Sequence, residues 1–206
     1  MGIRSRRDVL QTLFYATKNN AAEAWELHRQ LEPLEVRYDD GGVAVQAGNI
    51  MPRHELLNAK RAAEATAQDA ASAFVLILDY AIRRLRRDIA PVDARILGPQ
   101  VRNGVRLNNA IWALANQARH ADDWLAVPVA DIDNDPVARN SVQVFRALAL
   151  DPHDLNAARE FICGLNVNSY VAIEEMLLAT AHEVLVGTGW RLGMVSAGTY
   201  LLEPDR

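Results

Sequence analysis

Apolar residues recur at every third or fourth position in the first part of the chain, which is the spacing of one face of an amphipathic helix. Ser5 is placed to cap the start of this helix, and Pro33 lacks the backbone donor that a continuing helix would use. The pattern predicts a helix from about residue 6 to residue 31. Its stripe comprises Val9, Leu10, Leu13, Phe14, Ala16, Ala21, Ala24, Trp25 and Leu27.

The pattern changes to alternation directly after Pro33. Apolar and charged residues alternate in LEVRY, DDGG is typical of a tight turn, and the alternation resumes in VAVQ. These features predict a short β-hairpin at about residues 34–46.

Helical periodicity returns after Pro52 and covers most of the remaining chain. It predicts helices at about residues 52–89, 99–120, 137–150, 152–165 and 170–186, while the tail from Trp190 onward is ambiguous. We therefore expect a mostly α fold: a single helical bundle with a small N-terminal β-hairpin, in one domain spanning residues 1–206. Residues 168–206 would form its C-terminal helix and tail.

Composition and charge narrow the class of protein. The net charge of −4 provides no global basic field for nucleic acid, so any such contact has to be local. The longest apolar run, AFVLIL, is far too short to span a bilayer, and a single cysteine excludes an intramolecular disulfide. We expect a cytoplasmic protein without a membrane partner.

Four arginines end the helix predicted at residues 52–89: Arg83, Arg84, Arg86 and Arg87. Cations near a helix C-terminus interact favourably with the helix dipole, which is one interpretation. The other is a local phosphate-binding patch, for which we select Arg83, Arg84 and Arg87 as the RNA-binding candidates.

The helix predicted at residues 99–120 carries two different faces. Leu107, Ile111, Leu114 and Ala118 form a core stripe. On another side, residues spaced by four form a second row: Asn108, Trp112, Asn116 and His120. A row with one tryptophan and several polar groups fits a lined cleft or a protein interface, because such groups need both cover and hydrogen-bond partners. The alternative is a loosely packed surface.

This row favours a homodimer. We select Asn108, Trp112 and the nearby Trp124 as interface residues.

The segment Ala115-Asn116-Gln117-Ala118-Arg119-His120 resembles the signature of HEPN domains, which is an arginine, a polar residue, about three variable residues and a histidine. The longer run WALANQARHADDW is similar to uncharacterised bacterial HEPN-like proteins. The resemblance covers about residues 59–155 and implies a helical HEPN-like core at about residues 52–165.

The resemblance also implies an activity. Catalytic members are metal-independent endoribonucleases in which two protomers face one cleft, so the likeness supports a homodimer, RNA as ligand and a bacterial defence or toxin–antitoxin setting. His120 matches the signature histidine and Asn116 the polar position. The signature arginine falls on Ala115, which carries no functional group. Arg119 is the substitute candidate, although it can equally pair with Asp122 or Asp123.

Three hypotheses follow. The first is a non-catalytic HEPN-like module that binds RNA, a nucleotide or a partner protein, and the Ala115 departure favours it. The second is a ribonuclease with an altered site, in which His120, Asn116 and Arg119 are the catalytic candidates. The third is a plain helical interaction protein.

Metal and cofactor sites find no support in the sequence. Asp122 and Asp123 beside His120 are typical of a helix end, and DIDND lacks the glycine and the distal glutamate of a calcium loop. The chain has no glycine-rich phosphate loop. We expect neither a metal nor a cofactor.

Overall fold

A computed structural model describes residues 3–35, 53–89, 95, 97–128, 131, 134, 138–165, 167, 169–186, 189–196 and 199–204 of the chain.

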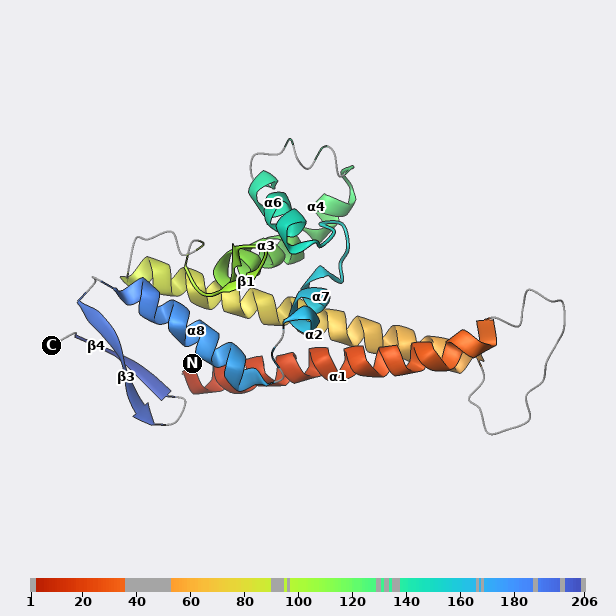
Figure 1. The fold of residues 1–206 in the computed structure, drawn as a ribbon, viewed down its shortest axis with the longest axis horizontal. Helices are drawn as coiled ribbons and strands as arrows, with labels where there is room; N and C mark the ends of the chain where they lie inside the picture. The colour runs from red at the N-terminus through yellow and green to blue at the C-terminus, as the bar shows by residue number, and fades with distance from the viewer. Residues whose placement is uncertain are drawn as a thin grey trace.

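Two long helices form the lower layer of the molecule. Helix α1 (Ile3–Glu35) and helix α2 (Arg53–Ile89) run antiparallel and pack against each other along much of their length (Figure 1). The buried stripe of α2 contains Leu56, Ala63, Ala67, Ala70, Ala71, Phe74 and Leu78. Spacing by three and four keeps these residues on one side, and the small alanines favour both helix formation and close packing.

Helix α1 extends beyond both of its predicted ends. It begins at Ile3 and includes Pro33, so the predicted stop at this proline is wrong. A proline in the last turn disturbs few hydrogen bonds of the helix, and packing of the apolar face supplies most of the stability of a helix in a protein. Leu31, close to this end, is 2% exposed.

The hairpin predicted at residues 34–46 lies almost wholly outside the described residues. Its first two residues, Leu34 and Glu35, belong to the last turn of α1.

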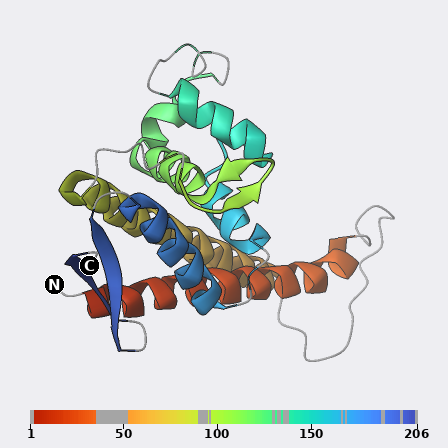
Figure 2. The same cartoon turned by 60° about the vertical axis from the view of Figure 1, so that its left-hand side comes forward.

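A second layer of short elements lies on one side of α2 (Figures 1 and 2). Helix α3 packs between α2 and α6, and α7 contacts both α1 and α2. The elements are β1 (Gln100–Arg102), β2 (Val105–Arg106), α3 (Leu107–Arg119), α4 (Ala121–Leu125), α6 (Arg139–Leu148) and α7 (Ala157–Gly164).

Residues 100–106, predicted to be helical, form the antiparallel β1–β2 hairpin instead. Asn103 and Gly104 make the turn, with φ of 47° and 78°. Asn-Gly is the preferred pair for a two-residue turn that requires positive φ at both positions. The third helix therefore begins at Leu107 rather than at Pro99.

The C-terminal part lies near the start of α1. Helix α8 (Tyr170–Leu185) contacts α1 and α2, and Ser169 caps its first turn by accepting a hydrogen bond from the Ala172 amide. Strands β3 (Trp190–Ser196) and β4 (Thr199–Pro204) then form an antiparallel hairpin next to α8, at the end of the molecule where α1 begins (Figure 1).

One continuous apolar core joins the two layers, with residues from α1, α2, α3, α6, α7 and α8. Helix α3 lies at its centre, and Ala110, Ala113, Leu114 and Ala115 have no exposed surface. The mostly helical character of the fold is confirmed. The arrangement is a long helical pair with a separate layer of short elements, so the single bundle expected from the sequence is not confirmed. No helix among the described residues is long and apolar enough to cross a membrane.

Candidate functional site

The polar row of α3 does not form one exposed face. Asn108 is 1% exposed and Asn116 is 8% exposed, whereas Trp112 is half-buried and His120 is 48% exposed at its side chain. Helix α6, which packs on α3, covers Asn116, whereas Asn108 lies beside Gly98. The Asn116 amide donates to the Ser141 hydroxyl of α6 at 3.2 Å, between two buried side chains.

His120 has different surroundings from Asn116. It is the residue at which α3 ends and α4 begins, with φ of −119° and ψ of 25°. Its Nδ1 lies 3.3 Å from Oδ2 of Asp123, which is itself exposed. The two residues that match the family signature are therefore four positions apart in sequence, but one is packed inside the protein and the other lies at the surface.

Arg119 is engaged away from His120. Its guanidinium forms an ion pair with Asp79 of α2, and Arg83 binds the same carboxylate at 2.7 Å. Pairing of Arg119 with Asp122 or Asp123, which the sequence also suggested, is not what the structure shows. Arg83, one of the three RNA-binding candidates, is thus ion-paired within the protein. The side chains of the other two candidates, Arg84 and Arg87, are outside the part of the chain that the structure describes.

Ala115 belongs to the core, with no exposed surface. A longer side chain at this position would displace neighbours in the centre of the protein. The position that matches the signature arginine therefore lies in the packed core, where the structure leaves no room for an arginine side chain.

Two of the three predicted interface residues are also buried within the chain. Trp124 is 6% exposed and packs edge-on against Phe145 of α6, with ring centroids 6.0 Å apart. Asn108 is buried deeper still. Neither presents a side chain that a second protomer can contact in this conformation. Trp112 is the predicted interface residue that does reach a surface cavity.

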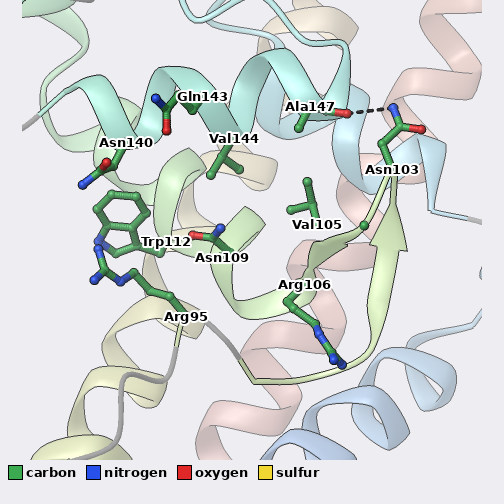
Figure 3. Close-up of a pocket in the computed structure, with 11 residues that line it drawn as sticks. Arg95, Asn103, Val105, Arg106, Asn109, Trp112, Asn140, Gln143, Val144 and Ala147 are labelled. Carbon is green, nitrogen blue, oxygen red and sulfur yellow. Dashed lines mark hydrogen bonds between the residues drawn. The ribbon is translucent and has the colours of Figure 1, made fainter.

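That cavity is an open groove of about 660 Å³ between the β1–β2 hairpin, α3 and α6 (Figure 3). Trp112 and Asn109 enter it from α3, and Asn140 and Gln143 enter it from α6 (Figure 3). Its lining consists of Arg95, Asn103, Gly104, Val105, Arg106, Asn109, Trp112, Asn140, Gln143, Val144 and Ala147. We call it the Trp112 groove.

The Trp112 groove differs in charge from the chain as a whole. Its lining includes two arginines and four residues with side-chain amides, and among its described lining residues there is no carboxylate. The guanidinium of one of these arginines, Arg106, points away from Trp112 (Figure 3). The chain itself is acidic, with a net charge of −4. The Arg95 guanidinium lies over the Trp112 ring, 5.2 Å from its centroid. A positive, amide-rich groove with one aromatic ring can accept an anionic ligand that has a planar polar part.

A local network fixes the edge of the groove below Arg106. The Arg106 guanidinium donates to the Gly98 carbonyl at 2.8 Å, and the Gly98 amide donates to the Glu183 carboxylate of α8, also at 2.8 Å. Gly98 has φ of 90°, and a Cβ here would lie 2.7 Å from the Thr180 hydroxyl. Only glycine satisfies both constraints. The network therefore ties the groove to α8.

A second anchor holds the opposite end of the groove. The Asn103 amide, at the tip of the β1–β2 turn, donates to the Ala147 carbonyl of α6 at 2.8 Å (Figure 3). This bond joins the hairpin to α6, so that two walls of the groove are held together.

In the described part of the chain, no group of three or more histidine, cysteine, aspartate or glutamate residues could hold a metal ion.

Comparison of the chain with protein-family models, with curated proteins and with solved structures finds no match. The HEPN resemblance therefore depends on the motif residues alone.

Sequence reasoning found one residue of the groove, Trp112, and missed the others. Asn103 and Gly104 carried a usable signal, because Asn-Gly between short apolar segments is a strong indication of a hairpin. Asn140 and Gln143 carried none, since they reach Trp112 only through the packing of α6 on α3. Arg95, which precedes β1 in the chain, carried none either.

Proposed function

We propose that this chain is a non-catalytic module that binds RNA or a nucleotide in the Trp112 groove. The observation that carries the proposal is the lining of the groove: arginines and amides without a carboxylate, around an aromatic ring. Guanidinium groups bind phosphate oxygens, and an exposed aromatic face stacks on a base. Both are common components of sites for single-stranded nucleic acid.

The surroundings of the signature residues support the non-catalytic form. Ribose 2′-OH attack on the adjacent phosphodiester needs a proton acceptor and a group that stabilises developing negative charge. His120 can supply the first. Arg119 is paired with Asp79 and Asn116 with Ser141, so neither is free to supply the second.

The proposal is tested by fluorescence anisotropy with a labelled single-stranded RNA and with free nucleotides, between about 50 and 200 mM salt. We expect binding that weakens as salt rises, and a loss of about tenfold or more in Trp112→Ala. The matched control is Trp25→Ala, because Trp25 is 64% exposed on α1 and does not line the groove. Equal affinity in both variants would contradict the proposal. Absence of RNA and nucleotide binding would favour a protein-binding role.

The wider setting follows from the family resemblance and is part of the same proposal. It comprises membership of the HEPN-like proteins, a bacterial defence or toxin–antitoxin role, a cytoplasmic location and a homodimer. Light scattering at low micromolar concentration tests the homodimer directly. A monomeric mass at this concentration would contradict the homodimer and leave the groove proposal unaffected.

A further inference from the structure

We infer that α8 is an interface with a second copy of this chain, in which the two α8 helices pack antiparallel across a two-fold axis. This inference rests on the homodimer of the proposed function, to which it assigns a surface. It is independent of ligand binding in the Trp112 groove.

The first argument concerns the outward side of α8. This helix lies on the outside of the α1–α2 pair (Figures 1 and 2), and its inward side carries the buried residues Ile173 and Thr180. On the opposite side, in steps of four, three, four and four residues, a row runs along the helix: Val171, Glu175, Leu178, His182 and Val186. We call it the α8 row. Alternating steps of four and three are the spacing of residues that face a partner helix in a coiled coil.

The second argument concerns the apolar members of this row. Val171 is 53% exposed and Val186 is 80% exposed, at the two ends of the helix. Leu178 is half-buried at the middle, and its neighbour Ala179 is exposed. A helix at the surface normally carries its apolar residues on the inward side only, so apolar residues along the outward side as well are typical of a helix that another surface covers.

The third argument identifies the covering surface as a second α8. When two copies of the helix run antiparallel about an axis between Leu178 and Ala179, Val171 of one copy faces Val186 of the other. In the same arrangement Glu175 of one copy faces His182 of the other, and two-fold symmetry repeats each contact. An imidazole donates a hydrogen bond to a carboxylate, and it carries the opposite charge when protonated. The α8 row is therefore complementary to itself, as a two-fold interface requires.

The alternative arrangements lack this match. Two parallel copies of α8 would place Glu175 opposite Glu175 of the second copy, and juxtaposed like charges are unfavourable at an interface. A partner of different sequence would not require that the two halves of the α8 row complement each other. The observed order of residues therefore favours the antiparallel pair of identical helices.

The test exchanges the two polar residues of the α8 row. Sedimentation velocity gives the dimer dissociation constant of the wild type, of Glu175→His, of His182→Glu and of the double variant with both changes. His182→Glu places carboxylates opposite each other at two symmetric positions, so it should weaken the dimer by about tenfold or more, and Glu175→His should also weaken it. The double variant regains both carboxylate–imidazole pairs in exchanged positions, so its dissociation constant should return to within about threefold of the wild type.

The matched controls are Glu23→His and His54→Glu, at exposed positions of α1 and α2, which should leave the dissociation constant unchanged. Circular dichroism of each variant verifies that it is folded. Because the α8 row is exposed in the single chain, none of its substitutions should alter the helical signal.

The outcomes separate the interface from the proposed function. A dimer that neither single change weakens would overturn the α8 interface and leave the homodimer intact. A double variant as weak as His182→Glu would overturn the antiparallel pairing. A monomeric wild type at low micromolar concentration would overturn the interface together with the homodimer. RNA binding in the Trp112 groove is measured independently, by anisotropy, so its failure would not resemble any of these results.

Discussion

Arg119, the last residue of α3, forms an ion pair with Asp79 of α2, whose carboxylate it shares with Arg83. Asp79 is 2% exposed. A buried carboxylate loses its hydration, so its charge has to be stabilised by the two arginines. The ion pair with Arg119 also connects the end of α3 to the long helical pair.

Replacement of Asp79 by asparagine should therefore destabilise the protein. We expect a loss of about 1–3 kcal/mol in the free energy of unfolding, at the lower end because Arg83 and Arg119 can both reach solvent. Urea denaturation followed by circular dichroism measures it. Glu64→Gln is the matched control, since Glu64 pairs with Lys60 on the surface of α2 and should change stability by less than about 0.5 kcal/mol. Equal effects of the two substitutions would contradict the structural role of Asp79.

Ala115→Arg introduces the arginine of the HEPN signature and should destabilise the core. Ala115 has no exposed surface, so the new side chain both overpacks its neighbours and buries a charge. The expected cost is about 3 kcal/mol or more. Ala65→Arg, at an exposed position of α2, is the control and should change stability little. An unchanged melting temperature of Ala115→Arg, together with a gain of RNA cleavage, would instead identify a ribonuclease scaffold.

Tyr170 should make stability depend on pH in the alkaline range. Burial raises the pKa of its hydroxyl from 10.0 to about 12, and the nearby Glu174 adds to the effect. Between these values the unfolded chain has released this proton and the folded chain has not. The free energy of unfolding therefore falls as pH rises from about 10 to about 12, by about 2 kcal/mol, and the contribution is fully present below pH 10.

Urea denaturation across this pH range tests the prediction. Tyr170→Phe should show a correspondingly shallower fall. Tyr80→Phe should retain the slope of the wild type, because Tyr80 is 56% exposed. Identical slopes in all three proteins would show that Tyr170 ionises as easily in the folded state as in the unfolded state.

His120→Ala should leave any RNA cleavage unchanged. The His120 ring lies next to the Asp123 carboxylate and has neither of the other two catalytic candidates beside it. Asn116 is hydrogen-bonded to Ser141, and Arg119 is ion-paired with Asp79. Incubation of structured RNA with excess chelator, comparing the wild type with the variant, measures this. Cleavage that is chelator-resistant and lost in His120→Ala would contradict the non-catalytic proposal and favour the altered ribonuclease.

The sequence predicted the features that depend on local pattern. The long helices follow from apolar spacing by three and four. The helix end predicted at Pro33 is wrong, because packing of the apolar face at Leu31 holds the last turn of α1 helical. The hairpin at residues 100–106 was present in the sequence as Asn103-Gly104 and was missed within an apparently helical segment.

The site could be predicted only in part, because the partners of α3 come from distant segments. Helical geometry correctly placed Leu107, Ile111 and Leu114 in the core, but it could not show that Asn108 would be buried as deeply or that α6 would cover Asn116. Nor could it show that Arg119 would find Asp79, forty positions earlier. Trp112 remained at a surface groove, and that groove is formed by α6 and the β1–β2 hairpin together with α3.

Photocrosslinking tests the central claim, that the Trp112 groove is where RNA binds. Single-stranded RNA with a photoreactive nucleoside is irradiated with the protein, which is then digested with trypsin and analysed by mass spectrometry. Cleavage after arginine yields the peptides Leu107–Arg119, with Asn109 and Trp112, and Asn140–Arg146, with Asn140 and Gln143. We predict RNA adducts on one or both of these peptides. Adducts confined to peptides without any lining residue of the groove, such as those around the arginines at positions 83–87, would contradict the claim.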